Sequence, residues 1–394
     1  MKRFLFLIAA ATLIAAPLLA QEEGPATAKG ASVDTTGKGY SAAYVLETST
    51  HRVLFEENAH APLPTASMSK MMTALLTMEE IRDGRLHLSD PVQISARTAK
   101  MGGSQIFAKE GQTFTVQVLL ATLMVQSAND SAEALAEKIG GSAENFADLM
   151  NDRARQLGLK ETRFYDPHGL PNSANPQQIN TMSAHDLAIL GMELMKYPLM
   201  REYAKTAEMP FTNGTFTAGI INPNHLINPH KQDYFADATG IKTGYSGPAG
   251  YCVTASAKRG NMELICVVMG AKRTAGPESS FGIASRLMSN AFSTWRLMEA
   301  VKPGQTVGQD PVVGGLTGTV TVVAAGGANV LVKRGEEGSF KVAFAGTGVT
   351  APVKKGQPLG TVAIQQNGQT VAKAPVIAAN DVAKSPWWKK YSPF

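Results

Sequence analysis

An apolar pattern with helical spacing marks the stretch from Ser67 to Glu80, which contains neither Gly nor Pro. Its many Met, Ala and Leu residues favour an α-helix. The apolar side chains wrap most of the circumference, which is typical of a buried helix rather than a surface helix. Because residues i and i+3 share one face of a helix, we expect the hydroxyl of Ser67 to lie beside the amine of Lys70.

Further periodic runs continue to about residue 299. Short strand-like runs at 41–47 and 52–55 flank a polar turn and predict a β-hairpin. Helices are predicted over the following ranges: 115–126, 131–139, 143–157, 183–195 and 279–299. Strand candidates lie at 240–243, 251–257 and 262–269. Since helices lie on both sides of these strands in the sequence, an α/β or α+β domain is favoured.

Two of these helices have recognisable start signals. Asp130 followed by Glu133 resembles a capping box at the start of the 131–139 helix, which Gly140 and Gly141 would end. Ser183 is the predicted cap of the 183–195 helix. Between these helical regions, residues 164–180 are rich in Pro and polar residues and predict a long loop.

The pattern changes from Val301 onward. Short β-rich runs separated by Gly-rich turns lie at 317–324, 329–332, 339–344, 359–365 and 370–375. They predict a second, all-β domain of about 85 residues, which is large enough to fold alone. It has no His or Cys and no cluster of titratable residues, so no chemistry is assigned to it. The predicted organisation is a domain over 39–299, a β-rich domain over 300–385 and a short tail, 386–394.

The N-terminus has the layout of a secretory signal. Lys2 and Arg3 precede an apolar stretch, and residues 17–20 end in a small residue before Gln21. The apolar run of roughly 13 to 17 residues is short for a membrane span, so a cleaved signal over 1–20 is favoured over a retained anchor. Residues 21–38 are rich in Gly, Ala and Thr and are predicted to be a linker.

Composition narrows the class of partner. The 394 residues are 44% apolar and 18% charged, which is typical of a globular protein. The net charge of +5 falls to +3 without Lys2 and Arg3, and no Lys/Arg block follows, so nucleic acid is not an expected partner. At the other end, Trp387, Trp388, Lys389 and Lys390 suit a peripheral contact with the inner membrane, while a plain basic tail stays open as an alternative.

Cysteine and histidine give weaker signals. Cys252 and Cys266 flank a turn near Arg259, and if the turn centres on that residue they face each other across a hairpin. Packed thiols are favoured there over a disulfide, although export makes the bond possible. The seven histidines show no metal-ligand spacing, so neither a metal nor another cofactor is expected.

Two further short motifs add candidate chemistry to Ser67 and Lys70. Ser127-Ala128-Asn129 lies between two predicted helices and offers a hydroxyl for proton transfer and an amide for binding a peptide. Lys242-Thr243-Gly244 lies in a predicted strand, where the lysine could anchor a carboxylate and the glycine allows close approach of another backbone. Each motif alone is also explained by ordinary turns, caps and edge strands.

Together and in this order, the motifs Ser-x-x-Lys, Ser-x-Asn and Lys-Thr-Gly resemble those of penicillin-binding proteins and serine β-lactamases. The resemblance is closest to the low-molecular-mass penicillin-binding proteins that are serine-type D-alanyl-D-alanine carboxypeptidases. It implies a penicillin-binding, transpeptidase-like catalytic domain followed by a small all-β domain, and it covers nearly all of the predicted mature chain. Supporting stretches include PTASMSKMMTALL, DPHGLP and GIKTGYSGPAGYC.

The resemblance implies a reaction and roles for its catalytic residues. Ser67 would attack the carbonyl between two D-alanines of a peptidoglycan pentapeptide, and water would hydrolyse the acyl-enzyme. Lys70 would be the base, with its pKa lowered by burial and by the charge of Lys242. Ser127 would pass the proton to the leaving amine. The enzyme would act in the periplasm or on the outer face of the cytoplasmic membrane, and β-lactam antibiotics would acylate it.

The resemblance also implies the substrate-binding residues. Asn129 would hold the substrate amide, while Lys242 and Thr243 would bind the terminal carboxylate. Gly244 would leave room for the substrate backbone, and the N–H of Tyr245 would complete an oxyanion hole with that of Ser67. Some relatives have histidine in place of Tyr245, so no role is given to its side chain.

Two other functions are compatible with the same motifs. A serine β-lactamase of class A would have Asp where Ala128 stands and a glutamate in the loop before the third motif, yet residues 164–180 contain no Glu. Both departures favour the peptidase. A non-catalytic penicillin-binding scaffold is less favoured, because every catalytic position is present.

Overall fold

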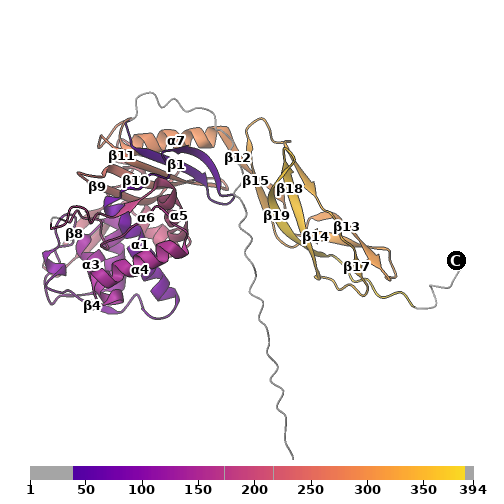
Figure 1. Ribbon diagram of the computed structural model, residues 1–394, viewed down its shortest axis with the longest axis horizontal. Helices are drawn as coiled ribbons and strands as arrows, with labels where there is room; N and C mark the ends of the chain where they lie inside the picture. Colours follow the sequence, from indigo (N-terminus) through magenta and orange to yellow (C-terminus); the bar gives the residue numbers. More distant parts are fainter. Residues whose placement is uncertain (1–38, 173, 216, 387–394) are drawn as a thin grey trace, which may run out of the picture.

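The computed structural model describes residues 39–172, 174–215 and 217–386 of the chain (Figure 1). The predicted signal peptide, the linker and the aromatic residues of the tail lie outside this range. The described chain forms a helix-plus-sheet part followed by an all-β part, which confirms the predicted fold class. Among the described residues, no helix combines the length and apolarity needed to cross a membrane.

The first part is built on an antiparallel sheet in the order β2-β1-β11-β10-β9. Its strands are β1 (Ala42–Glu47), β2 (Arg52–Glu57), β9 (Ala238–Ser246), β10 (Gly250–Arg259) and β11 (Met262–Ala271). All six residues of β1 are buried. Because successive side chains of a strand point to opposite faces, this pattern requires a cover on both faces of the sheet.

Helices supply that cover, as Figure 1 shows: α7 lies on one face and the remaining large helices lie on the other. The bounds are α1 (Lys70–Arg82), α2 (Val116–Val125), α3 (Asn129–Gly140), α4 (Ala143–Gln156), α5 (Ala184–Leu194), α6 (Pro198–Lys205) and α7 (Ser280–Thr294). Along β1, Tyr44 packs into the core shared with α1, whereas Val45 packs into the core shared with α7. Each face of the sheet therefore has its own apolar core.

Short elements connect the helices on the α1 side. They are β3 (Leu63–Pro64), β4 (Pro91–Gln93), β5 (Thr113–Thr115), β6 (Thr181–Met182), β7 (Glu208–Thr212) and β8 (Thr217–Ile221), with 3-10 turns η1 (Ala66–Ser69), η2 (Thr98–Lys100) and η3 (His225–Ile227). Strand β3 pairs with β6, β4 with β5, and β7 with β8. The β3–β6 pair brings the chain before η1 to the end of the 164–180 loop, so the loop and the turn that carries Ser67 are neighbours.

The all-β part contains a pair, β12 (Trp295–Val301) with β15 (Ala328–Lys333), and a sheet in the order β16-β18-β19-β14-β13-β17. The bounds of that sheet are β13 (Thr306–Val313), β14 (Thr319–Ala324), β16 (Phe340–Ala343), β17 (Val349–Thr350), β18 (Pro358–Gln366) and β19 (Gln369–Ala378). It has its own core of Val, Ile and Ala side chains. It is therefore a separately packed unit joined to the first part through β12.

Two predictions about local structure are wrong. The predicted helix 279–299 ends at Thr294, because Trp295 and the residues after it pair with β15 as strand β12. Asp130 does not cap a helix: α3 begins at Asn129, and the Asp130 carboxylate accepts hydrogen bonds from the backbone N–H groups of Ile106 and Ala108. The predicted cap at Ser183, in contrast, is confirmed, since its hydroxyl accepts from the N–H of Asp186.

The two cysteines do not face each other. Arg259 pairs with Met262, so the register of the hairpin places Cys266 opposite Ala255 rather than Cys252. Cys252 packs into the core on the α1 side of the sheet and Cys266 into the core on the α7 side. Both are free, buried thiols, and burial raises the pKa of Cys252 to about 11. They are packing residues on opposite faces.

Candidate active site

Ser67 and Lys70 are in direct contact at the junction of η1 and α1. The Nζ of Lys70 donates a hydrogen bond of 2.8 Å to the Oγ of Ser67. The i, i+3 spacing predicted this neighbourhood, although the first turn is a 3-10 turn and the α-helix begins only at Lys70. Lys70 is completely buried. The arrangement thus pairs a hydroxyl with an amine that is shielded from water.

The 164–180 loop holds Lys70 from the other side. The backbone O of His168 accepts a second hydrogen bond from Lys70 Nζ, at 3.0 Å, and the O of Pro167 accepts from the hydroxyl of Thr73, one turn further along α1. Gly169 has a φ of +83°, and a Cβ there would collide with the backbone O of Ala66. The close approach of loop and turn therefore requires glycine.

Asn180 anchors the end of this loop to the same turn. Its side chain is buried, and its Nδ2 donates to the Oγ of Ser69 at 3.0 Å and to the backbone O of Asp166 at 2.9 Å. Its Oδ1 accepts from the N–H of Tyr165 at 2.7 Å. The sequence pattern predicts only a loop here. It does not reveal the positioning role of Asn180, because nothing in the pattern tells which backbone carbonyl will meet Lys70.

The environment of Lys70 favours the neutral amine. Burial, followed by the charge of Lys242, holds the pKa of Lys70 well below its usual value, while the carboxylates of Asp166 and Asp130 oppose this shift. Because desolvation penalises the charged form of a lysine, a fully buried ammonium gives up its proton more readily than an exposed one. A neutral Lys70 can accept the proton of the adjacent hydroxyl.

Ser127 and Asn129 lie in the connection between α2 and α3. Ser127 has a φ of +65°, in the left-handed region, and its buried Oγ has no hydrogen-bond partner among the described residues. The Nδ2 of Asn129 donates to the O of Gly102 at 2.6 Å, and its backbone N–H donates to the O of Ser104 at 2.7 Å. The Oδ1 of Asn129 is likewise buried and without a partner in the described chain. A free hydroxyl and a free amide oxygen are thus held ready to bind a ligand.

Strand β9 contributes Lys242, Thr243, Gly244 and Tyr245 at the edge of the sheet. Lys242 is buried, donates to the backbone O of Thr243 at 3.2 Å, and has its pKa lowered to about 7 by burial. A Cβ at Gly244 would lie 2.7 Å from the O of Thr65 and 3.2 Å from the N of Ser67. The strand therefore touches the turn that carries Ser67. The side chain of Tyr245 is exposed and stacks on Tyr251.

All three motif segments are connected in space. Gly244 lies against the Ser67 turn, and the charge of Lys242 acts on Lys70. Asn129 donates to the O of Gly102, and a Cβ at the next residue, Gly103, would lie 2.8 Å from Asn129 Nδ2 and 3.4 Å from Leu170 in the loop that holds Lys70. Strand β9 thus contacts the Ser67 turn directly, and Asn129 is linked to it through the loop at 102–103 and the 164–180 loop.

Comparisons with known proteins agree with this geometry. The sequence profile of the D-alanyl-D-alanine carboxypeptidase family matches residues 31–273, and that of the penicillin-binding protein 5 C-terminal domain matches residues 295–384. D-alanyl-D-alanine carboxypeptidase DacF of Bacillus subtilis (strain 168) is 36% identical over 346 residues, covering 87% of this chain and 86% of that protein.

Solved structures give the same result. Penicillin binding protein 5 from Haemophilus influenzae superposes with a TM-score of 0.72 at 27% identity, covering 88% of this chain and 98% of its own. Penicillin-binding protein D2 from Listeria monocytogenes, in its ampicillin-bound form, covers 64% of this chain and 97% of its own at 27% identity, with a TM-score of 0.56. The likeness thus extends over both parts of the chain.

Proposed function

The chain belongs to the D-alanyl-D-alanine carboxypeptidase family, and from this premise we propose that it removes the terminal D-alanine of peptidoglycan stem peptides through an acyl-enzyme on Ser67. One observation carries the assignment of the nucleophile: the buried Lys70 lies 2.8 Å from the Ser67 hydroxyl. A nucleophile in contact with a base of lowered pKa is the arrangement that acyl transfer requires.

Acylation begins with proton transfer from Ser67 to a neutral Lys70. The Oγ of Ser67 attacks the carbonyl carbon of the scissile amide, and the negative charge that develops on oxygen is stabilised by the backbone N–H groups of Ser67 and Tyr245. The C–N bond then breaks, and the departing amine of D-alanine takes up a proton through Ser127. The unpartnered, buried hydroxyl of Ser127 supports this relay. Water finally hydrolyses the ester, releasing the shortened peptide and restoring the Ser67 hydroxyl.

Substrate binding falls to strand β9 and Asn129. Lys242 in its charged form and the hydroxyl of Thr243 bind the terminal carboxylate, and the Asn129 side chain binds a backbone amide of the stem peptide. Gly244 keeps the strand close to the Ser67 turn. β-Lactam antibiotics are expected to acylate Ser67 in the same way, and the ampicillin-bound form of the related Listeria protein supports this.

Release of D-alanine from a synthetic pentapeptide ending in D-alanyl-D-alanine tests the proposal. Wild-type protein should release it, whereas Ser67→Ala should not. Lys242→Ala should remain folded but show a strongly raised KM, because the carboxylate loses its counter-charge. A wild-type protein without activity, or a Ser67→Ala variant with full activity, would contradict the proposed reaction. Rapid turnover of penicillin, instead of an acyl-enzyme that lasts for hours, would indicate a β-lactamase.

Export is part of the same proposal. Peptidoglycan lies outside the cytoplasmic membrane, and residues 1–20 have the layout of a secretory signal. The expected location is therefore the periplasm or the outer face of the cytoplasmic membrane. Contact with the membrane through Trp387, Trp388, Lys389 and Lys390 stays a prediction, since these residues lie outside the described range.

A further inference from the structure

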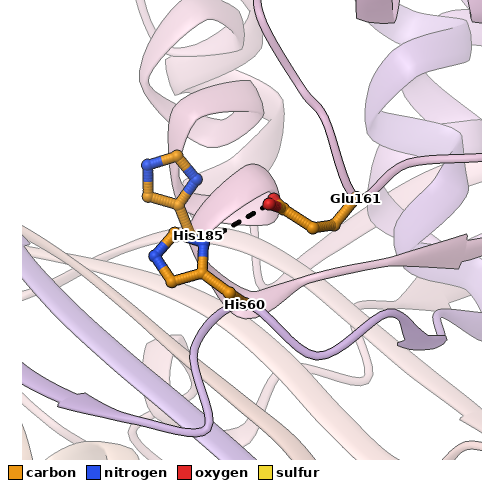
Figure 2. A group of neighbouring side chains, drawn as sticks. All are labelled: His60, Glu161 and His185. Carbon is orange, nitrogen blue, oxygen red and sulfur yellow. Dashed lines mark ion pairs between the residues drawn. The ribbon is translucent and has the colours of Figure 1, made fainter.

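A second cluster of chemically active side chains consists of His60, Glu161 and His185 (Figure 2). Each offers a donor atom, and the three atoms lie within 4.8 Å of one another. His60 Nδ1 is 3.6 Å from Glu161 Oε1, and the two imidazole rings have centroids 4.8 Å apart. The proposed reaction uses none of the three. Because they come from distant parts of the chain, no sequence spacing indicates that they meet.

The backbone around the cluster is fixed by hydrogen bonds. The N–H of His185, in the first turn of α5, donates to the O of Ala59 at 3.0 Å, which sets the position of His60 next to it. The N–H of Glu161 donates to Oδ2 of Asp186 at 2.9 Å. The chain after β2, the loop after α4 and the start of α5 are therefore held together before any ligand binds.

Buried side chains also orient the donor atoms. Asp186 is fully buried, and its Oδ1 lies 3.0 Å from Nδ1 of His185. This contact fixes the orientation of the His185 ring. A carboxylate in contact with one ring nitrogen is characteristic of histidines that bind metals. The hydroxyl of Ser183 donates to Oε2 of Glu161 at 3.3 Å, on the carboxylate oxygen other than the one facing His60.

A simple ion pair between His60 and Glu161 explains less of this arrangement. Their 3.6 Å separation is too long for a hydrogen bond, and the His60 side chain is 59% exposed, so such a pair would be weak. Two imidazoles and one carboxylate around an open fourth position are, in contrast, a ligand set that zinc uses.

We propose that His60, Glu161 and His185 bind a Zn²⁺ ion, with water in the fourth position. In a tetrahedral zinc site with bonds of ~2.0–2.1 Å, the donor atoms lie about 3.3 Å apart. A separation within 4.8 Å therefore requires only a small rotation of side chains, for which the exposed His60 has room. The ion would link the chain after β2, the loop after α4 and the start of α5. The loop after α4 leads into the 164–180 loop.

Isothermal titration calorimetry with ZnCl₂, on the mature chain after treatment with chelator, tests this directly. Wild-type protein should bind one Zn²⁺ ion at this site. His60→Ala and Glu161→Gln should each weaken binding at least about tenfold, because each removes a ligand. Thermal melts without zinc show whether each variant keeps its fold, and the exposure of His60 makes a folded His60→Ala variant the expected result.

His87→Ala is the matched control. His87 also lies 3.6 Å from a carboxylate, that of Asp90, but it is not part of the cluster. Its removal should leave zinc affinity unchanged. Cobalt replacement should give the intense visible absorption of a four-coordinate site in wild-type protein and not in His60→Ala. The proposal would be overturned by a wild type that does not bind zinc, or by equal affinities in wild type, His60→Ala and Glu161→Gln.

Discussion

At the residue scale, the main feature of the molecule is a pair of buried lysines with opposite requirements. In the proposed reaction, Lys70 must be neutral to take the proton of Ser67, whereas Lys242 must be charged to bind a carboxylate. Burial lowers the pKa of both, and the charge of Lys242 lowers that of Lys70 further. Burial of these two amines therefore lowers the free energy of unfolding, and such perturbed groups are typical of active sites.

This cost should be measurable with Lys242→Met. The pKa of Lys242 is about 7 in the folded protein, against an ordinary value of 10.5. Below pH 7 the folded protein must hold a desolvated charge. Between pH 7 and 10.5, Lys242 binds more protons in the unfolded chain than in the folded protein. Its contribution to the free energy of unfolding of the wild type therefore rises with pH. Removal of the amine should therefore stabilise the protein by ~2–4 kcal/mol at pH 6 and by less at pH 9.

Urea denaturation at the two pH values makes the comparison, with the exposed Lys354→Met as control. The control should change stability little at either pH. If Lys242→Met lowered the free energy of unfolding at pH 6, burial would not be the origin of the pKa shift.

The same two lysines predict the pH dependence of catalysis. As pH rises through the pKa of Lys70, the neutral base accumulates and kcat/KM should increase. As pH rises through about 7, Lys242 loses its charge and kcat/KM should fall for a peptide with a free terminal carboxylate. A peptide with an amidated C-terminus should lose this falling limb, because it has no carboxylate to bind. Identical profiles for the two peptides would exclude Lys242 as the carboxylate ligand.

At the scale of elements, the site depends on three close approaches of backbone to backbone. Gly169 brings the 164–180 loop against Ala66, Gly244 brings β9 against Ser67, and Gly103 brings its loop against Asn129. In each case a Cβ would occupy space that another group already fills. The precision of the site therefore comes from contacts between elements and not from any one helix.

Gly244→Ala tests this idea. The added methyl would press on the O of Thr65 and the N of Ser67, so strand and turn must separate. We expect the free energy of unfolding to fall by about 1–3 kcal/mol. We also expect a large fall in kcat, although only one methyl group is added, because the strand and the Ser67 turn would be displaced from each other. Gly247→Ala, in the turn after the same strand, is the control because nothing lies within 4 Å of its Cβ position. Equal rates of D-alanine release in the two variants would contradict the tight packing of β9 on η1.

The elements themselves were largely predictable, but their contacts were not. The apolar period correctly predicts a helix after Ser67 and strands on either side of residue 259, and the serine at position 183 correctly predicts a helix cap. The apolar period does not show which strands will pair with each other. The predicted helix 279–299 therefore includes residues that form strand β12, which pairs with β15. The hydrogen bond from Lys70 to the O of His168 could not be foreseen either, because every residue offers the same carbonyl.

At the scale of the whole molecule, the two parts meet where β2 approaches β12 and β15. The guanidinium of Arg52 lies 4.3 Å over the ring of Trp295 and donates to the backbone O of Leu331. Trp295 and Leu331 belong to the core that also contains α7. The β-rich part is thus attached at the edge strand β2, and Figure 1 shows it extending away from the helices around Ser67.

Arg52→Ala should weaken the contact between the two parts of the chain without affecting the active site. We expect a loss of about 1 kcal/mol at the contact and faster proteolysis between the two parts. D-alanine release from a short peptide should stay within about twofold of wild type, since Arg52 does not belong to the site. Arg296→Ala, on the exposed face of β12, is the matched control for charge removal. If Arg52→Ala abolished the release of D-alanine, the contact between the two parts would be needed for the geometry of the active site.

The central claim is that Ser67 is the nucleophile activated by Lys70. Mass spectrometry of the protein after brief incubation with penicillin, followed by digestion and mapping of the adduct, tests it most directly. We predict one added penicillin per chain, located on Ser67, and a strongly reduced rate of its formation in Lys70→Ala. An adduct on Ser127, or an undiminished rate without Lys70, would contradict the account.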